Sequence, residues 1–244
     1  MSNTILELKN IHKSFGDNAV HRGIDLKLNK GESLGLLGGS GTGKSALLRS
    51  IIGLERIDQG EILFHGERFD HLKEDKLTPF RIKISYSFQS GALFDSINVF
   101  ENIAYPLFEH TRFSYKQIKD KVAEMLKLID LPGRENIMPS DLSGGMQKRV
   151  GMARAMILNP EVILYDEPTA GLDPANTLNV LSLMQRLKEK GLASIFVTHD
   201  IAAAMSLCDR IVVLHEGKII FNDTPTNFQN STDPIVAKFV MHKD

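Results

Sequence analysis

Short apolar segments dominate the first ninety residues and predict β-strands. Residues 24–28 alternate apolar and polar side chains, which is typical of a strand with one face in water. Residues 33–37 are almost continuously apolar, as expected of a strand buried on both faces. Further short strands are predicted at 61–64 and 84–88. Between them, a glycine-rich turn leads into a predicted helix whose apolar face carries Leu47, Leu48, Ile51 and Ile52.

A helical pattern replaces the strands from about Val99 to Met156. Ser114, followed three residues later by Gln117, forms a capping box, and apolar residues recur behind it at helical spacing. Strands and helices then alternate again, with strands predicted at 162–165 and 194–198, a helical stripe at 180–187, and a hairpin of 211–214 with 218–221. The pattern therefore indicates one α/β core that carries a helical insertion, rather than two independent domains.

Composition narrows the classes of function. The chain has 244 residues, 42% of them hydrophobic and 24% charged, as in an ordinary globular protein. A formal net charge of −1 gives no field that would favour nucleic acid. With Cys208 as the only cysteine, no disulfide framework is possible, which fits a reducing cytoplasm. We expect no signal peptide and no direct membrane insertion, so any membrane process would need a separate membrane subunit.

The glycine-rich turn fits the phosphate-binding pattern G-x-x-x-x-G-K-[ST], called the P-loop, and lies between a buried strand and a helix. Its residues are Gly38, Gly39, Ser40, Gly41, Thr42, Gly43, Lys44 and Ser45. Glycines let backbone N–H groups approach phosphates, and the helix N-terminus adds positive potential. Lys44 would reach the β- and γ-phosphates, and the Ser45 hydroxyl would bind Mg²⁺. The alternative, a glycine-rich turn before a structural helix, does not explain lysine and serine in register.

Two acidic residues end the apolar strand at 162–165. Asp166 would hold Mg²⁺ from the side opposite Ser45, and Glu167 would polarise the attacking water as a general base. The alternative to a metal and catalytic site is two ordinary solvated acids at a strand end. The presence of the phosphate-binding loop argues against this alternative. His199 directly follows the strand at 194–198, at the sheet edge where α/β proteins bind ligands. We predict that His199 senses the γ-phosphate, although a lone histidine after a strand is more often structural.

A second glycine-rich helix start lies at Leu142–Met146. Ser143 can cap this helix, which should run to about Met156, and Gly144 and Gly145 leave backbone N–H groups open to an anion. A serine-capped helix would be ordinary by itself. Together with the P-loop it makes a second anion site in one chain, which a generic P-loop enzyme does not need.

The full set of motifs, in this order, resembles the ATP-binding-cassette (ABC) family over nearly the whole chain. The resemblance implies an α/β P-loop NTPase core with an antiparallel β subdomain and an inserted α-helical subdomain. Residues 1–244 would form one nucleotide-binding domain, with a core of about 1–88 and 157–244 and a helical subdomain of about 89–156.

The resemblance also assigns roles by position. Phe15 would stack on the adenine of ATP, unless it is simply a buried aromatic at a strand end. Gln89 would sense both Mg²⁺ and the membrane partner. The segment Leu142–Met146, with Ser143, Gly144 and Gly145, would be the family's signature motif (LSGGQ). The segment 170–173, which ends in Asp173, would be the D-loop, and His199 the switch histidine. The implied catalytic set is Lys44, Gln89, Glu167 and His199, the implied metal ligands are Ser45, Gln89 and Asp166, and the implied cofactors are ATP and Mg²⁺.

The family mechanism implies a homodimer. Two copies pack head to tail, and each ATP lies between the P-loop of one copy and the signature of the other, which would explain two anion sites per chain. Two positions depart from the usual pattern. Met146 replaces the glutamine of the signature, with Gln147 one place later, and Ala46 replaces a threonine near the α-phosphate. The backbone amides of Gly144 and Gly145 remain, so we expect γ-phosphate binding to survive. Ala46 would remove one hydrogen bond near the α-phosphate, worth at most about 1.5–3 kcal/mol, and water or a backbone N–H could replace it.

Residues 142–150 and 88–102 resemble those of ABC ATPases that serve MlaE-type permeases with Mce-domain proteins. Such systems move phospholipids or other lipids across the bacterial envelope, or related lipids in chloroplasts. The resemblance implies an MlaE-like permease and an Mce-domain protein as partners, and it is compatible with a small accessory subunit. It places the chain at the cytoplasmic face of the bacterial inner membrane, held there by the permease. The apolar stretch Gln89–Asn102 is expected either to pack in the core or to form a groove for a permease helix.

Other classes remain open. Cassettes for amino acids or lipoproteins would share all the ATP chemistry, and a cassette could instead regulate cell-wall remodelling through a membrane complex. Ribosome-acting and chromosome-type ABC proteins are disfavoured, because the chain has one cassette and no long heptad run. A P-loop kinase or GTPase would leave the Ser143–Gly145 site unused.

Overall fold

A six-stranded, mostly parallel sheet forms the centre of the computed structural model, which describes residues 3–241. Its strand order is β10-β9-β3-β8-β7-β6, and only the pair β9–β10 is antiparallel. The strands are β3 (Ser33–Leu37), β6 (Ile84–Ser87), β7 (Val162–Asp166), β8 (Ala193–Val197), β9 (Arg210–His215) and β10 (Lys218–Asp223). The carboxyl ends of the parallel strands thus meet at one edge, where ligands of such sheets bind.

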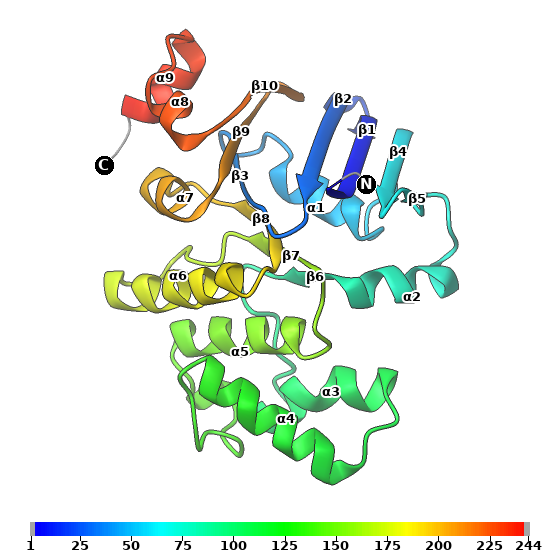
Figure 1. Cartoon of the computed structure of the whole chain (residues 1–244), viewed down its shortest axis with the longest axis vertical. Helices are drawn as coiled ribbons and strands as arrows, with labels where there is room; N and C mark the ends of the chain where they lie inside the picture. Colours follow the sequence, from blue (N-terminus) through cyan, green and yellow to red (C-terminus); the bar gives the residue numbers. More distant parts are fainter. Residues whose placement is uncertain (1–2, 242–244) are drawn as a thin grey trace.

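A second, antiparallel sheet has the order β2-β1-β4-β5. It contains β1 (Thr4–Phe15), β2 (Asn18–Asn29), β4 (Gln59–Phe64) and β5 (Glu67–Arg68). The strands expected at 24–28 and 61–64 lie within β2 and β4. Figure 1 shows this sheet toward one end of the molecule, with the helices of residues 99–156 at the other end.

Three α-helices and a short 3-10 helix (Pro139–Asp141) lie between β6 and β7 in the chain, as the pattern predicted for residues 99–156. The α-helices are α3 (Val99–His110), α4 (Tyr115–Leu128) and α5 (Gly144–Met156). The capping box of α4 is confirmed, since Gln117 N donates to Ser114 Oγ at 3.4 Å and Ser114 N donates to Gln117 Oε1 at 2.8 Å. The other helices are α1 (Lys44–Ile51), α2 (Glu74–Lys83), α6 (Pro174–Glu189), α7 (Ile201–Leu207), α8 (Pro225–Gln229) and α9 (Pro234–Met241).

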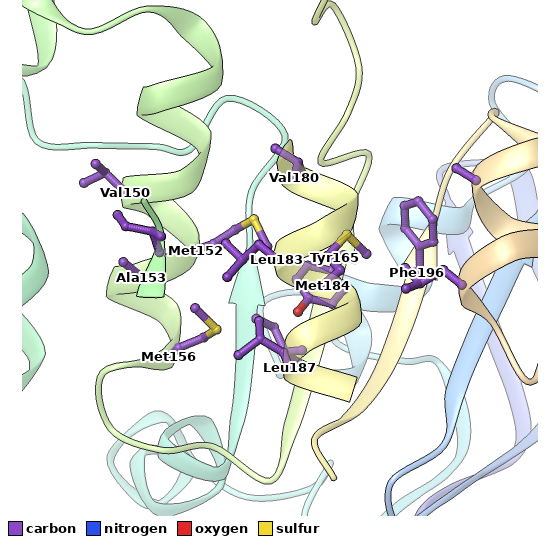
Figure 2. Packing of buried hydrophobic residues seen from close by; sticks show 14 of the residues in the cluster. Val150, Met152, Ala153, Met156, Tyr165, Val180, Leu183, Met184, Leu187 and Phe196 are labelled. Atoms are coloured by element: carbon purple, nitrogen blue, oxygen red, sulfur yellow. The ribbon is translucent and has the colours of Figure 1, made fainter. Parts of the chain in front are cut away.

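The inner strands of the central sheet, β3, β7, β8 and β9, are buried on both faces and send side chains to two hydrophobic clusters. Ile163 and Tyr165 of β7 pack in the cluster that contains α5 and α6, whereas Val162 and Leu164 face α1 and the antiparallel sheet. Figure 2 shows the first cluster, in which residues 150–156 of α5 face residues 180–187 of α6. Burial on both faces explains why these strands are almost continuously apolar.

The predicted fold class is confirmed: an α/β core, an antiparallel sheet and an inserted group of helices. The division into subdomains at residues 89 and 156 stays a prediction, and α5 shares one core cluster with α6 across that boundary. Among residues 3–241, no helix has the length and apolar character needed to cross a membrane.

Candidate active site

The P-loop runs from the end of β3 into α1, where it is pressed against β2. Gly43, the residue before α1, has φ +95°. A Cβ at this position would lie 2.3 Å from Val20 Cγ1 and 2.8 Å from His21 Nε2. His21 Nε2 also lies 3.0 Å from the Gly43 carbonyl oxygen. Only glycine therefore fits at residue 43, and β2 packs directly against the loop at the start of α1.

Lys44 and Ser45 open α1 and face the strand-end carboxylates. Lys44 is only 5% exposed, and its Nζ donates to the carbonyl oxygens of Gly38 at 2.8 Å and Gly39 at 2.9 Å. Burial lowers the pKa of Lys44, and the carboxylates of Glu167 and Asp166 act in the opposite direction. The ammonium group is thus held over the loop, at the position where a phosphate chain would pass.

Asp166, the last residue of β7, is held by two hydroxyl groups. Ser45 Oγ donates to its Oδ1 at 2.7 Å, and Tyr86 on β6 donates from its hydroxyl to Oδ2 at 2.6 Å. Serine and carboxylate oxygens suit Mg²⁺. No group of three or more His, Cys, Asp or Glu side chains within residues 3–241 could hold a metal ion alone. The fit is therefore to a cation that takes its other ligands from phosphates and water.

Glu167 and His199 meet at the same sheet edge. His199 Nε2 lies 2.7 Å from Glu167 Oε1, and both side chains are partly exposed. Glu167 has φ +49°, an uncommon value for a residue other than glycine, and its backbone N–H donates to the Val197 carbonyl at 3.0 Å. Strained backbone of this kind concentrates at functional sites, and here it accompanies the contact between the Glu167 carboxylate and His199.

A cavity of about 370 Å³ brings these groups together. It is lined by Phe15, Val20, Ser40, Gly41, Thr42, Gly43, Lys44, Ser45, Ala46, Arg49, Glu167 and His199. Phe15 is 43% exposed at the end of β1, so the alternative of a buried strand-end aromatic does not hold, while its stacking on adenine stays a prediction. No motif in the sequence pointed to Val20 or Arg49, because both reach the cavity through position alone.

The signature residues Ser143, Gly144 and Gly145 lie outside the P-loop cavity. Among the described residues that line the 370 Å³ cavity, none comes from the segment 143–145. Ser143 caps α5, accepting from Met146 N at 3.4 Å. A Cβ on Gly145 would lie 2.4 Å from Asn176 Oδ1, so this glycine lets α5 start directly beside α6. Asp173 caps α6, accepting from Asn176 N at 2.9 Å. One chain thus presents two separate glycine-rich helix starts.

Gln89 lies outside the P-loop cavity, unlike Ala46, one of the two residues that depart from the family pattern. Gln89 is exposed just beyond β6, so its metal and catalytic roles stay predictions. Gln147 does not take the place of the missing signature glutamine, because its amide donates to the carbonyls of Pro139 at 2.8 Å and Leu142 at 3.3 Å. Met146 packs against the core cluster, and Ala46 is 6% exposed beside the P-loop.

A P-loop, two acids at a strand end, and a second glycine-rich helix start on an inserted helical segment define the nucleotide-binding subunit of an ABC transporter. The model of the ABC transporter family matches residues 21–170, and the chain belongs to that family. It is therefore a transport ATPase that binds ATP.

Particular relatives match along almost the whole chain. Protein TRIGALACTOSYLDIACYLGLYCEROL 3 of Arabidopsis thaliana is 39% identical over 255 residues, which cover 98% of this chain and 74% of the relative. The intermembrane phospholipid transport ATP-binding protein MlaF of Haemophilus influenzae is 37% identical over 241 residues, with 98% and 91% covered. The methionine import ATP-binding protein MetN of Francisella tularensis subsp. holarctica is 38% identical over 242 residues, with 97% and 69% covered.

A solved structure agrees in fold. The ATP-binding cassette MJ0796, in a dimeric post-hydrolysis state bound to ADP and Pi, superposes with a TM-score of 0.84 at 32% identity. The match covers 91% of this chain and 99% of that cassette.

Proposed function

We propose that two copies of this chain form a head-to-tail dimer that hydrolyses two MgATP and drives a separate membrane permease for lipids. The observation that carries the dimer is the separation of the two anion sites. The P-loop cavity contains no residue of the segment 143–145 among those described, so the signature is free to serve the nucleotide of a second copy. The related cassette MJ0796 is a dimer with ADP and Pi, which supports this arrangement.

The chemistry follows from the positions of the side chains. Lys44 and the N–H groups of α1 would stabilise the charge of the phosphates, while Ser45 and Asp166 would hold Mg²⁺, which neutralises charge that develops on the phosphoryl group. Glu167 would accept a proton from the attacking water. His199, 2.7 Å from that carboxylate, would fix its orientation and contact the γ-phosphate. Phe15 would cover the adenine at the mouth of the cavity.

A second cavity, of about 560 Å³, offers a place for the permease. We call it the coupling groove; it lies between the residues around β6 and the helices α3 and α5. Its exposed apolar side chains are Leu54, Phe88, Phe94 and Tyr105, and Arg154 lies over the Phe94 ring at 5.2 Å from its centroid. An apolar groove with a cationic edge suits a short amphipathic helix. Exposed aromatics in one concave patch also mark interaction sites.

Lipid is the cargo that the relatives favour. Two of them carry names that refer to intermembrane phospholipid transport and to a galactolipid, and each covers 98% of this chain. The segments 88–102 and 142–150 share the sequence features of cassettes that serve MlaE-type permeases. We therefore infer an MlaE-like permease with an Mce-domain protein as partners, with a small accessory subunit as an additional component, at the cytoplasmic face of a bacterial inner membrane. MetN, at 38% identity, makes methionine import the competing function.

The test is purification of the intact complex from its native membrane, followed by identification of the permease and reconstitution in phospholipid vesicles. We expect an MlaE-like permease, and ATP-dependent transfer of fluorescent phospholipid to acceptor vesicles. The same complex carrying Glu167→Gln should bind ATP and transfer no lipid. Recovery of an amino-acid permease, with ATPase activity stimulated by methionine and not by lipid, would overturn the proposal of lipid transport while leaving the ATPase assignment intact.

A further inference from the structure

Tyr86 connects two parts of the molecule that the proposed function treats separately. It lies on β6, the edge strand of the central sheet, in register with Leu164 of β7. Its hydroxyl donates to Asp166 Oδ2 at 2.6 Å, while the same residue lines the coupling groove. One side chain therefore reaches from the surface proposed for the permease to the carboxylate proposed for the metal.

The Asp166 end of this contact fixes the carboxylate. Oδ1 accepts from Ser45 Oγ at 2.7 Å and Oδ2 accepts from Tyr86, so both oxygens have a hydroxyl donor and the plane of the carboxylate is set. Asp166 is 8% exposed, which leaves little water to replace a lost donor.

The groove end of the contact is aromatic. The rings of Tyr86 and Phe88 lie 4.5 Å apart between centroids at an angle of 47°, and Phe88 is 40% exposed in the groove. A segment that fills the groove would press on Phe88 and on the Tyr86 ring. Because the ring and the hydroxyl are one rigid group, a shift of the ring moves the donor to Asp166 directly.

We propose that Tyr86 is a positioning residue that orients Asp166 for the metal ion and makes this orientation depend on the aromatic wall of the coupling groove. The contact with Asp166 does not rest on the identity of the permease. Only the statement that a partner uses the groove rests on the proposed function. Sequence alone did not single out Tyr86, because its role depends on the pairing of β6 with β7.

The test uses the isolated full chain and Mn²⁺, a paramagnetic substitute for Mg²⁺. The affinity of the ATP complex for Mn²⁺ is measured from the signal of free Mn²⁺, and ATP affinity is measured separately in EDTA. Tyr86→Phe keeps the ring and removes the hydroxyl. Residues that orient a metal ligand typically contribute about 10–100-fold to metal affinity, so we expect Mn²⁺ binding at least about tenfold weaker. The affinity for ATP in EDTA should be unchanged, which also shows that the variant is folded.

Tyr115→Phe is the matched control, because Tyr115 is 65% exposed on α4 and lies outside both cavities. It should keep wild-type Mn²⁺ affinity. Wild-type Mn²⁺ affinity in Tyr86→Phe would overturn the proposal.

The groove end is tested by Phe88→Ala in the same assay. Removing the ring that supports Tyr86 should also weaken Mn²⁺ binding, by less than the loss of the hydroxyl. Because both changes act through one contact, the double variant Tyr86→Phe/Phe88→Ala should be no weaker than Tyr86→Phe alone. No effect of Phe88→Ala, or an additive effect in the double variant, would overturn the link to the groove. Neither readout involves a permease or a lipid, so failure here is distinct from failure of the proposed transport function.

Discussion

Gly151, in the middle of α5, lies directly against Gly91 in the segment that follows β6. A Cβ at this position would lie 2.6 Å from the Gly91 carbonyl oxygen and 2.7 Å from Gly91 Cα. Carbon atoms pack at about 3.5–4.0 Å, so Gly151→Ala requires the two backbones to separate by about 1 Å. Both contacts are with backbone, which cannot move aside as a flexible side chain can.

Three effects decide the stability of Gly151→Ala, one favourable and two unfavourable. Helix propensity favours alanine over glycine by about 1 kcal/mol inside a helix. Overpacking costs about 1–3 kcal/mol. The separation also stretches the hydrogen bonds from Arg154 to the carbonyls of Gly91 at 3.2 Å and Ala92 at 2.6 Å. Bonds to a charged group are worth about 1.5–3 kcal/mol each, so their partial loss adds about 1 kcal/mol. The net expectation is a loss of about 1–3 kcal/mol of unfolding free energy.

The assay is urea unfolding of the isolated chain, followed by circular dichroism. Gly144→Ala is the matched control within α5, because its Cβ would meet only Leu172 Cδ2, at 3.9 Å. We expect the control to unfold at the wild-type urea concentration or slightly above it, and Gly151→Ala to unfold at a clearly lower one. Stabilisation by Gly151→Ala, as propensity alone predicts, would refute the close contact between α5 and the segment after β6.

Three further predictions concern the P-loop and its surroundings. Lys44→Ala should abolish nucleotide binding, measured with a fluorescent ATP analogue; retained affinity would remove Lys44 from the site. Glu167→Gln should bind ATP without turnover in a phosphate-release assay, and near-normal hydrolysis would remove Glu167 as the base. Burial lowers the pKa of His21 in the folded chain below its ordinary value of 6.5. As the pH falls below 6.5, the unfolded chain therefore binds a proton at His21 more readily than the folded chain, and the unfolding free energy should decrease. His21→Gln should reduce this acid-dependent loss in urea midpoints measured from pH 8 to 5, whereas the matched change at exposed His71 should not; an unaltered loss in His21→Gln would contradict the buried neutral imidazole.

Local motifs could be predicted from sequence because one short segment carries each of them. The helix predicted to start at Ser143 and to run to about Met156 agrees with α5, because a capping serine marks a helix start within a few residues. The helix α2 was missed for the opposite reason. Leu77 is its buried residue and Pro79 lies inside it, so no apolar stripe marks it. The short helices near the C-terminus likewise carry too few turns for a periodic pattern.

Contacts between distant segments could not be predicted. The approach of Gly91 to Gly151 and the hydrogen bond from Tyr86 to Asp166 depend on which strands and helices become neighbours. The stretch 89–102 shows why the two readings of its apolar residues remained open. Val99 is fully buried in the core, whereas Phe94 is 45% exposed in the coupling groove. Core packing therefore describes only part of the segment, and contact with a permease helix stays a prediction.

The most direct measurement of the central claim, that each ATP is shared between the P-loop of one copy and the signature of another, is light scattering of Glu167→Gln with MgATP. We predict that ATP doubles its mass. Adding Ser143→Arg should keep the chain monomeric while ATP remains bound, because the arginine blocks only the partner's site. A monomeric Glu167→Gln at saturating MgATP, or a dimer that forms despite Ser143→Arg, would contradict the shared site.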